Sequence, residues 1–505
     1  MKLLLPLVVV AATAQAAVIL PPSDDRVLKF SLEKRGSGPL HMSRSAAQAL
    51  GKRADSASLF NDYGSAYLVN VTIGTPGQTF QVALDTGSAD LWIPGTACPT
   101  TQCPYARFDS TKSSTFKNTT IAFQIQYGTG SALGTYATDT VQVAGATVQN
   151  QQFAVTYQTD GILTQGLSGS PSSSQQSSQV NPDGILGFGY PGITASAQTT
   201  AGPYNPFVFN LYQSKVITQT IFAVFLNNQY VTGNSGEITL GGTDSSKYTG
   251  NINYVTVQPT FQSTGSSQYG YWAVTLNSVS MSGNGGGAIT FNSQDIIFDT
   301  GTTLTYMSQQ VVQMLVNAVD SSAQFDSQNQ VYVVSCSAAS SSGNVTFTFP
   351  GQNGGTVTIS TPISQLVIPA DGAPSPQQSQ QCIFGVAPTG SADPTQNSAN
   401  SIWLLGDSVL RSAYLVFDFG ANRIGIASAS GVNGSTGGTP GSSSPGGSTT
   451  SAAPTLFASN PFSASGIFGP SATGNPSSRG VLLGINAGLL GAALIMVQMF
   501  FGYFM

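Results

Sequence analysis

Short apolar runs, broken by Gly, Asn, Ser and Pro, recur along the chain from about residue 60 to residue 430. They are rich in β-branched and aromatic residues, as in AYLVNVTIG, TFQVALD, IAFQIQYG and VTFTFP. Runs of this length and composition, each closed by turn-forming residues, predict strands, and their frequent reversals favour antiparallel pairing. The pattern therefore predicts an all-β fold with a few short helices.

Two stretches have helical periodicity instead. The first is PFVFNLYQSKVI from Pro206, and the second is SQQVVQMLVNAVD, where Ser308 is the expected N-cap. The apolar face predicted for the second helix consists of Val311, Val312, Met314, Leu315, Ala318 and Val319.

One strand pattern occurs twice. VALDTGSADLW contains Asp85, and IIFDTGTTLTYM contains Asp299, which lies 214 residues later. A second element repeats as DGILGFGY and IWLLGDSVL, so that Gly187 follows Asp85 by 102 residues and Gly406 follows Asp299 by 107. Two landmarks in the same order and at similar spacing predict two similar lobes.

The N-terminal segments are typical of secretion and processing. Residues 1–16 have a basic start, an apolar core and small residues before a cleavage point, as in a signal peptide. Residues 17–53 contain seven Lys and Arg against three acids and end in the dibasic pair Lys52-Arg53. We interpret them as a pro-segment that a dibasic-specific processing protease removes.

The lobes are expected at 54–225 and 226–430, followed by a Gly, Ser, Thr and Pro-rich stretch, 431–480. That composition cannot bury a core and predicts a disordered stalk. Residues 481–505 are apolar to the end. A transmembrane helix fits their length, but no Lys or Arg follows to stop transfer. Small residues, a polar spacer and an apolar tail favour a GPI-anchor signal, which predicts attachment to the plasma membrane or the cell wall.

The charge of the chain excludes further classes of function. From residue 54 onward the chain has eight Lys and Arg against eighteen Asp and Glu, a formal net charge of −10. No basic stripe is available to neutralise phosphates, so nucleic-acid binding is disfavoured. The single histidine, His41, lies in the predicted pro-segment. Histidine-based catalysis and histidine-ligated metals are thereby excluded from the predicted mature protein, and no cofactor is expected.

The repeat supplies a pair of carboxyl groups. If the lobes are related by a pseudo-twofold axis, Asp85 and Asp299 meet at their interface and share one proton. The charged member can take a proton from water while the protonated member donates to a carbonyl oxygen, which is general acid–base chemistry for amide hydrolysis. The residues expected to support the pair are Thr86, Gly87, Ser88, Thr300, Gly301 and Thr302.

These motifs identify a resemblance. ALDTGSADLWIPG, IQYGTGSALGTYATDTV, DGILGFGYP, GYWAVTL, IIFDTGTTLTYM and WLLGDSVLRSAYLVFDFGANRIGIA occur in the order found in the pepsin family of aspartic proteases. Together they cover approximately residues 65–428. Within that family, the chain resembles the secreted or GPI-anchored fungal yapsin and candidapepsin type. Ala89 and Asp90 depart from pepsin itself, and no effect on the carboxyl pair is expected.

The resemblance implies a bilobal fold, a central cleft and a flap hairpin over it. It places Tyr127, Gly128 and Thr129 in the flap, with Trp92 positioned to hydrogen-bond the Tyr127 hydroxyl. Polypeptide substrates and a monomeric enzyme are expected. The polar insertion at 160–182 is similar to a loop that is processed in yapsins.

Four cysteines in a secreted chain suggest two disulfides. Of three possible pairings, Cys98–Cys103 with Cys336–Cys382 is the most economical, because it closes one loop in each lobe. The candidate N-glycosylation sequons are at Asn70, Asn118, Asn344 and Asn433.

Two other classes of function compete with an active endopeptidase. One is a catalytically inactive binding protein on the same fold, and the other is a structural cell-wall protein, which the stalk and anchor would suit. Inactive relatives usually lose an aspartate, a following threonine or glycine, or the flap tyrosine, and all of these are present here. We therefore expect an aspartic endopeptidase.

Overall fold

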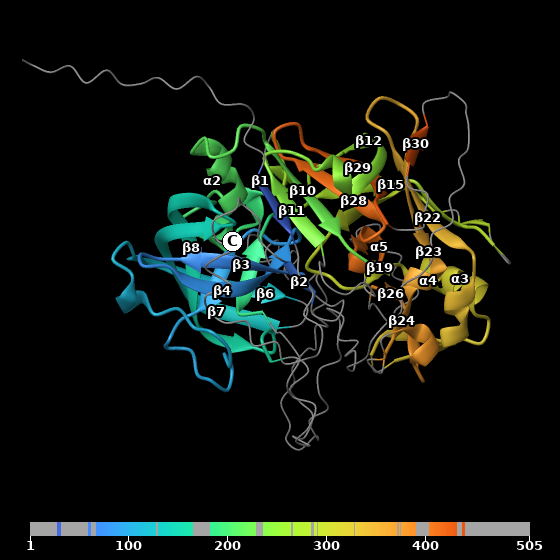
Figure 1. Ribbon diagram of the computed structural model, residues 1–505, viewed down its shortest axis with the longest axis horizontal. Coiled ribbons are helices and arrows are strands. Elements are labelled where there is room, and N and C mark those ends of the chain that lie inside the picture. Colours follow the sequence, from blue (N-terminus) through green and yellow to red (C-terminus); the bar gives the residue numbers. More distant parts are fainter. Residues whose placement is uncertain are drawn as a thin grey trace, which may run out of the picture.

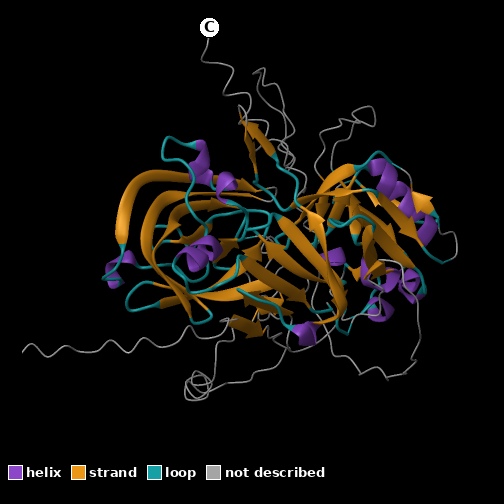
Figure 2. Ribbon diagram, turned by 90° about the horizontal axis from the view of Figure 1, so that it is seen from above, coloured by secondary structure: helices purple, strands orange, loops and turns teal. Residues whose placement is uncertain are grey.

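The chain folds into two mostly β halves with a sheet between them (Figure 1). The helices are short, and strands dominate both halves (Figure 2). The all-β, two-lobed prediction is thereby confirmed. The computed structural model describes residues 28–31, 59–61, 67–127, 130–164, 182–228, 236–263, 266–283, 287–289, 291–327, 329–370, 373, 375–389, 403–431 and 437–439.

The N-terminal half is built on one eight-stranded sheet. Its strands alternate between buried apolar and exposed polar positions, as in β7 (Gly130–Val143) and β8 (Ala146–Asp160), because one face covers the core. In spatial order the strands are β2 (Leu59–Asn61), β3 (Tyr67–Ile73), β4 (Gln78–Asp85), β9 (Gly184–Gly187), β5 (Leu91–Pro94), β8 (Ala146–Asp160), β7 (Gly130–Val143) and β6 (Lys117–Tyr127).

A six-stranded sheet lies between the halves (Figure 1). The predicted boundary between residues 225 and 226 falls inside one of its central strands, β10 (Ile221–Leu226). In spatial order the strands are β1 (Leu28–Ser31), β11 (Gly236–Leu240), β10 (Ile221–Leu226), β28 (Ala413–Asp418), β29 (Arg423–Ala429) and β12 (Tyr248–Thr256).

The C-terminal half divides its strands among several smaller sheets. One contains β15 (Ala273–Leu276), β18 (Gln294–Phe298), β27 (Trp403–Leu405), β19 (Thr305–Met307) and β26 (Val386–Pro388). A second contains β17 (Ala288–Ile289), β16 (Ser278–Met281), β22 (Asn344–Pro350), β23 (Thr356–Pro362) and β30 (Gly437–Thr439). The others are β20 (Gln324–Asp326), β21 (Val331–Val334), β25 (Cys382–Phe384) and β24 (Val367–Pro369), and the hairpin β13 (Phe261–Ser263) with β14 (Ser266–Gln268).

Both predicted helices form, but the second differs in detail. Ser308 precedes it, although its side chain makes no capping hydrogen bond, and Met314 is 38% exposed while Val316 is fully buried. The helix packs through a stripe centred on Val312 and Val316, which lie one turn apart. The predicted apolar face was therefore rotated about the helix axis relative to the buried one. The helices are α2 (Phe207–Gln213), α3 (Gln309–Val319), α4 (Ile363–Leu366) and α5 (Asp407–Leu410), with 3₁₀ turns at Ser110–Lys112, Pro191–Ile193, Ala195–Gln198, Ser245–Lys247, Cys336–Ser340 and Pro376–Gln378.

The two repeated landmarks are neighbours in each half. β4 pairs in parallel with β9, which sets Asp85 opposite Gly187, and β18 pairs in parallel with β27. A Cβ on Gly187 would lie 2.5 Å from the Ala89 backbone, and one on Gly406 would collide with the Leu304 carbonyl oxygen. The loop after each aspartate therefore crosses directly over a glycine, which explains why the glycine repeats along with the aspartate.

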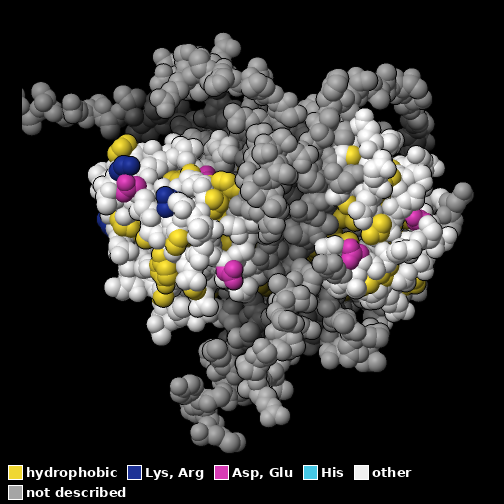
Figure 3. All heavy atoms as spheres, turned by 90° about the horizontal axis from the view of Figure 1, so that it is seen from below, with side chains coloured by type: hydrophobic (Ala, Val, Ile, Leu, Met, Phe, Trp, Pro, Cys, Tyr) yellow, Lys and Arg dark blue, Asp and Glu magenta, His cyan; other side chains and the backbone are white. Residues whose placement is uncertain are grey.

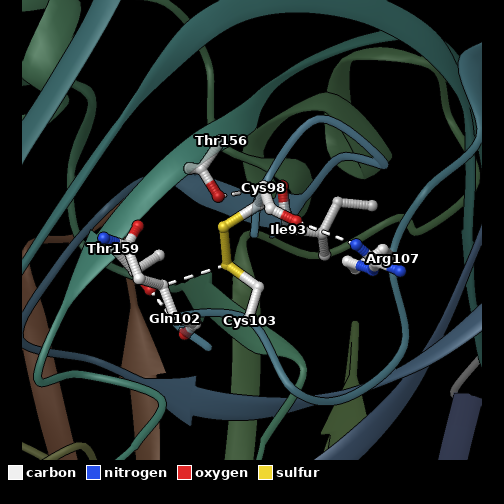
Figure 4. Close-up of a disulfide and its surroundings, with 7 residues drawn as sticks. All are labelled: Ile93, Cys98, Gln102, Cys103, Arg107, Thr156 and Thr159. Atoms are coloured by element: carbon white, nitrogen blue, oxygen red, sulfur yellow. Dashed lines mark hydrogen bonds between the residues drawn. A yellow bond between two sulfur atoms is a disulfide. The ribbon is translucent and has the colours of Figure 1, made fainter. Parts of the chain in front are cut away.

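Both predicted disulfides are confirmed, Cys98–Cys103 and Cys336–Cys382. Figure 4 shows the first, whose sulfurs are buried next to the end of β8. The Thr159 hydroxyl donates to the Gln102 carbonyl oxygen at 2.9 Å, within the loop that the disulfide closes. The small loop is thus fixed to the sheet by both a covalent and a polar contact.

The start of the predicted stalk is different from the expectation. Gly437–Thr439 forms β30, which pairs antiparallel with β23, so these residues belong to a sheet of the C-terminal half and are not part of a disordered stalk. Backbone hydrogen bonds at a sheet edge need no particular side chain, which is why composition did not reveal the strand. The predicted signal peptide, the dibasic pair and residues 481–505 lie outside the described residues. No helix among those described is long and apolar enough to span a membrane.

Candidate active site

Asp85 and Asp299 reach the junction of the two halves from equivalent strands. Asp85 is the last residue of β4, and Asp299 directly follows β18. A Cβ placed on Gly87 would lie 2.6 Å from the Asp299 carboxyl carbon, and one on Gly301 would lie 2.5 Å from an Asp85 carboxylate oxygen. Each carboxyl group thus packs against the glycine of the opposite turn, and any larger residue there would collide with it.

The two carboxyl groups have matching hydrogen bonds. The Gly87 N–H donates to Asp85 Oδ1 at 2.7 Å and the Ser88 hydroxyl donates to Oδ2 at 2.5 Å. On the other side, the Gly301 N–H and the Thr302 hydroxyl donate to the two oxygens of Asp299 at 2.8 and 2.5 Å. These donors fix both carboxyl groups in place before any substrate arrives.

Thr86 and Thr300 connect the halves directly beneath the carboxyl pair. The Thr86 hydroxyl donates to the Phe298 carbonyl oxygen at 2.8 Å and accepts from the Thr300 N–H at 3.0 Å. In return, the Thr300 hydroxyl donates to the Leu84 carbonyl oxygen at 3.0 Å and accepts from the Thr86 N–H at 3.2 Å. Both threonines are buried, so these four hydrogen bonds fix the positions of the two turns relative to each other.

Burial and mutual repulsion govern the protons of the pair. Asp85 is only 6% exposed and Asp299 only 7%. Burial raises the pKa of Asp85 to about 8, and the negative charge of Asp299 adds to the increase, whereas hydrogen bonds from Ser88 and Gly87 oppose it. Two carboxyl groups this close cannot both ionise easily, so the pair keeps one proton across a wide pH range.

The tyrosine expected in the flap is in contact with the expected tryptophan. Trp92 Nε1 donates to the Tyr127 hydroxyl at 2.8 Å, and Tyr127 ends β6, which forms a hairpin with β7. The residues at the tip, Gly128 and Thr129, lie outside the described residues. The structure therefore brings Tyr127 and Trp92 together near Asp85. Burial is the main cause that raises the pKa of Tyr127, and the charge of Asp85 adds to it.

The sequons have different degrees of exposure. Asn118 is exposed on β6, whereas Asn70 and Asn344 are half-buried within paired strands. An oligosaccharide needs a side chain that faces solvent, so Asn118 is the most accessible of these three. Asn433, Lys52 and Arg53 lie outside the described residues.

Sequence analysis missed a third carboxyl group near the pair. Asp407, the first residue of α5, is fully buried, and neither carboxylate oxygen has a hydrogen-bond partner among the described residues. Burial raises its pKa well above the ordinary value; Arg411 counteracts this in part, and the charges of Asp299 and Asp85 increase it. The only feature of the sequence that pointed to Asp407 was its place directly after the repeated Gly406. Asp407 is best described as a carboxyl group that is protonated, and therefore neutral, at low pH.

Buried carboxyl groups predict a protein that is more stable in acid than at neutral pH. Burial is the largest cause of the raised pKa values of Asp90, Asp183 and Glu237. The folded state therefore binds protons more tightly than the unfolded chain, and stability is lost as the pH rises above the ordinary Asp value of 3.8. We expect Tm to fall steadily between about pH 4 and pH 8, measured by calorimetry at constant ionic strength.

Asp109 and Asp320 have lowered pKa values and act in the opposite direction, but both are partly exposed to solvent. Asp183→Asn is the matched variant, because it removes one of the buried titrating groups and should flatten the dependence. A Tm that is higher at pH 7 than at pH 4.5 would contradict the prediction.

The surface is poor in charge. On the face seen in Figure 3, charged side chains are few and scattered among uncharged ones in the described part.

Among the described residues no cluster of His, Cys, Asp and Glu could hold a metal ion.

Comparison with known proteins identifies the family to which this sequence is similar. Residues 66–429 match the family model of eukaryotic aspartyl proteases. Pepsin A of Suncus murinus is 34% identical over 370 residues, which are 73% of this chain and 82% of that protein. Mucorpepsin of Rhizomucor pusillus is 31% identical over 422 residues, which are 80% of this chain and 91% of that protein.

Solved structures give the same result. The crystal structure of an aspartic proteinase from Irpex lacteus superimposes with a TM-score of 0.56 and 25% sequence identity. The similarity covers 73% of this chain and 96% of that one. The pepsin-like fold expected from the motifs is therefore confirmed.

Proposed function

Because the chain belongs to the family of eukaryotic aspartyl proteases, we propose that this aspartic endopeptidase is secreted, surface-anchored, made as a zymogen and favoured by acidic pH. Asp85 and Asp299 are its catalytic residues in this proposal. The single observation that carries the assignment is the reciprocal arrangement of the two Asp-Thr-Gly turns, in which each carboxyl group packs against the glycine of the other.

The mechanism follows from one proton shared by two carboxyl groups. The ionised member takes a proton from a water molecule, and that water attacks the carbonyl carbon of the peptide bond. The protonated member donates its proton to the carbonyl oxygen as the tetrahedral intermediate forms. Ser88 and Thr302 keep the accepting oxygens oriented, and Tyr127 closes over the substrate. The pair must keep this shared proton, so activity is lost once the pH rises far enough to remove it.

One experiment tests the activity. Residues 17–470 are expressed, activated in acid and incubated with a diverse peptide mixture from pH 3 to pH 7, with and without a statine-type transition-state analogue. We expect cleavage that is strongest in acid and blocked by the analogue. Failure to cleave at any pH, or cleavage that the analogue leaves unchanged, would refute the proposal.

The zymogen proposal rests on charge and on strand pairing. The segment 17–53 has a net charge of +4 against −10 for residues 54–505, so it is attracted to the body at neutral pH. Leu28–Ser31, within this segment, pairs antiparallel with β11 along the edge of the six-stranded sheet. We propose that the segment covers the cleft until acid weakens its hold. The test is a chain that begins at Ala54. If this chain folds but does not cleave faster than the precursor at any pH, the proposal is ruled out.

Anchoring and subtype are proposed together. The apolar segment 481–505 acts as a GPI-anchor signal, and the chain is of the yapsin and candidapepsin type. Support comes from the tail sequence and from the two disulfides, Cys98–Cys103 and Cys336–Cys382. Release of the membrane-bound protein from cells by a phosphatidylinositol-specific phospholipase C is the expected result, and retention in the membrane after that treatment would contradict a GPI anchor.

A further inference from the structure

A buried carboxyl group, Asp90, lies five residues after Asp85 at the entrance to β5 and is fully inaccessible to solvent. Its Oδ1 accepts from the hydroxyl groups of Tyr136 and Tyr204 at 2.7 and 2.9 Å. Its Oδ2 accepts from the Ala195 N–H at 2.7 Å. Asp90 forms no ion pair with Lys or Arg in the part of the chain that the structure describes. A buried carboxyl group held by three donors and no cation requires an explanation.

The three donors come from separate segments. Tyr136 lies on β7, the second strand of the flap hairpin, while Ala195 and Tyr204 belong to the loop between β9 and α2. The loop is also fixed to β7 directly, because the Ser196 N–H donates to the Tyr136 hydroxyl at 3.0 Å. Asp90 therefore joins the strand that follows the catalytic turn, the flap hairpin and this loop at one point.

The cluster around Asp90 contains the flap tyrosine. Trp92 and Tyr136 belong to one buried apolar cluster, and Tyr127, Ala195 and Tyr204 pack against it. Tyr136 and Tyr204 also meet edge to face, with ring centroids 5.6 Å apart. The segments that Asp90 joins are thus the walls against which Trp92 and Tyr127 are placed.

We propose that Asp90 is a positioning residue for the peptidase reaction: by gathering Tyr136, Tyr204 and the Ala195 amide it sets the base of the flap, and so aligns Tyr127 with the catalytic carboxyl pair. The inference rests on the active-site assignment proposed above. Asp90 itself does not touch the reacting atoms. Its contribution passes through Trp92 and Tyr127, whose mutual hydrogen bond at 2.8 Å depends on where the flap strands lie.

Asparagine cannot replace this carboxyl group without losing a contact. In Asp90→Asn, an amide oxygen at the Oδ1 position would leave the new NH₂ facing the Ala195 N–H, donor against donor. In the flipped orientation the NH₂ faces the two tyrosine hydroxyls, whose protons then have no acceptor at this position. Either orientation breaks at least one buried hydrogen bond.

Asp183 provides a matched control. It is also a buried aspartate without a cation partner among the described residues, and it accepts from the Gln81 and Ala106 N–H groups at 2.8 and 2.9 Å. Asp183→Asn breaks a comparable buried bond. The broken bond, however, lies beside Gln81 in the middle of β4, four residues before Asp85. A loss of stability alone should therefore affect both variants alike.

The experiment compares wild type, Asp90→Asn and Asp183→Asn as processed enzymes, with concentrations set by active-site titration. For Asp90→Asn we expect kcat/KM to fall about tenfold and the inhibition constant of a statine-type analogue to rise by the same factor, as for one lost transition-state contact. Asp183→Asn should keep both values while its Tm falls. Values for Asp90→Asn within about twofold of wild type, or an equal loss in Asp183→Asn, would overturn the inference.

Tyr204→Phe is the second variant, because it removes only one donor and keeps the test possible if Asp90→Asn does not fold. Its expected loss is smaller, and the Asp90→Asn, Tyr204→Phe double variant should lose no more than Asp90→Asn alone, since both act on one contact. Fully additive losses would contradict the inference. A wild-type enzyme that cleaves nothing would refute the proposed function, which is a separate outcome.

Discussion

Asp85→Asn should lower kcat by about 10⁴-fold, as expected when an essential acid–base group is lost from a catalytic unit. An amide has the shape of a carboxyl group but can neither hold nor accept the shared proton. The Gly87 and Ser88 donors lie 2.7 and 2.5 Å from the carboxylate oxygens and hold this side chain in place. No other group can therefore move in and replace the lost carboxyl group. Single-turnover cleavage of a peptide substrate at the acidic optimum measures the effect.

Asp295→Asn is the control for this variant. Asp295 lies on β18, four residues before Asp299, and its side chain is exposed. It should keep full activity. The Tm of Asp85→Asn should stay near or above that of wild type, because the substitution also removes the repulsion between two neighbouring buried carboxyl groups. Cleavage by Asp85→Asn that persists and resists the statine-type analogue would disprove the carboxyl-pair mechanism.

Thr86→Val should cause the largest loss of stability among single substitutions at the lobe junction. Valine keeps the shape of threonine but removes the hydroxyl, which leaves the Phe298 carbonyl and the Thr300 N–H buried without a partner. Each unsatisfied group costs about 1–3 kcal/mol, so the free energy of unfolding should fall by about 2–6 kcal/mol. Activity should also fall, because a displacement of about 1 Å between the two turns can cost about 100-fold in rate.

Thr86→Ser is the matched variant for this prediction. It keeps the hydroxyl and loses only a methyl group, so stability and kcat should stay much closer to wild type. Denaturant unfolding followed by tryptophan fluorescence measures the difference. Equal unfolding free energies for the Val and Ser variants would show that the interlobe hydrogen bonds do not stabilise the junction.

Local signals predicted much of the fold. Strand runs, two helices and both disulfides follow from periodicity, turn residues and the positions of four cysteines. The errors arose where tertiary packing decides. The buried face of α3 includes Val316 and excludes Met314, because the neighbouring sheet selects the stripe. β30 forms within a Gly-rich stretch because the edge of β23 offers backbone partners.

The sequence by itself determined the chemistry. Two Asp-Thr-Gly turns at matching distances from two glycines, with the only histidine at position 41, leave carboxyl groups as the available acid–base pair. This information is local, since each turn is specified by a few adjacent residues. What the sequence did not show is how those residues meet partners that lie far away along the chain.

The tertiary structure alone decided two features of the site. It buried Asp407 beside the pair, and it enclosed Asp90 with two tyrosines and an amide. Each depends on segments brought together by packing, and burial in that packing is what raises the carboxyl pKa values. A residue type can be read along the chain, but its solvation and its partners exist only once the chain has folded.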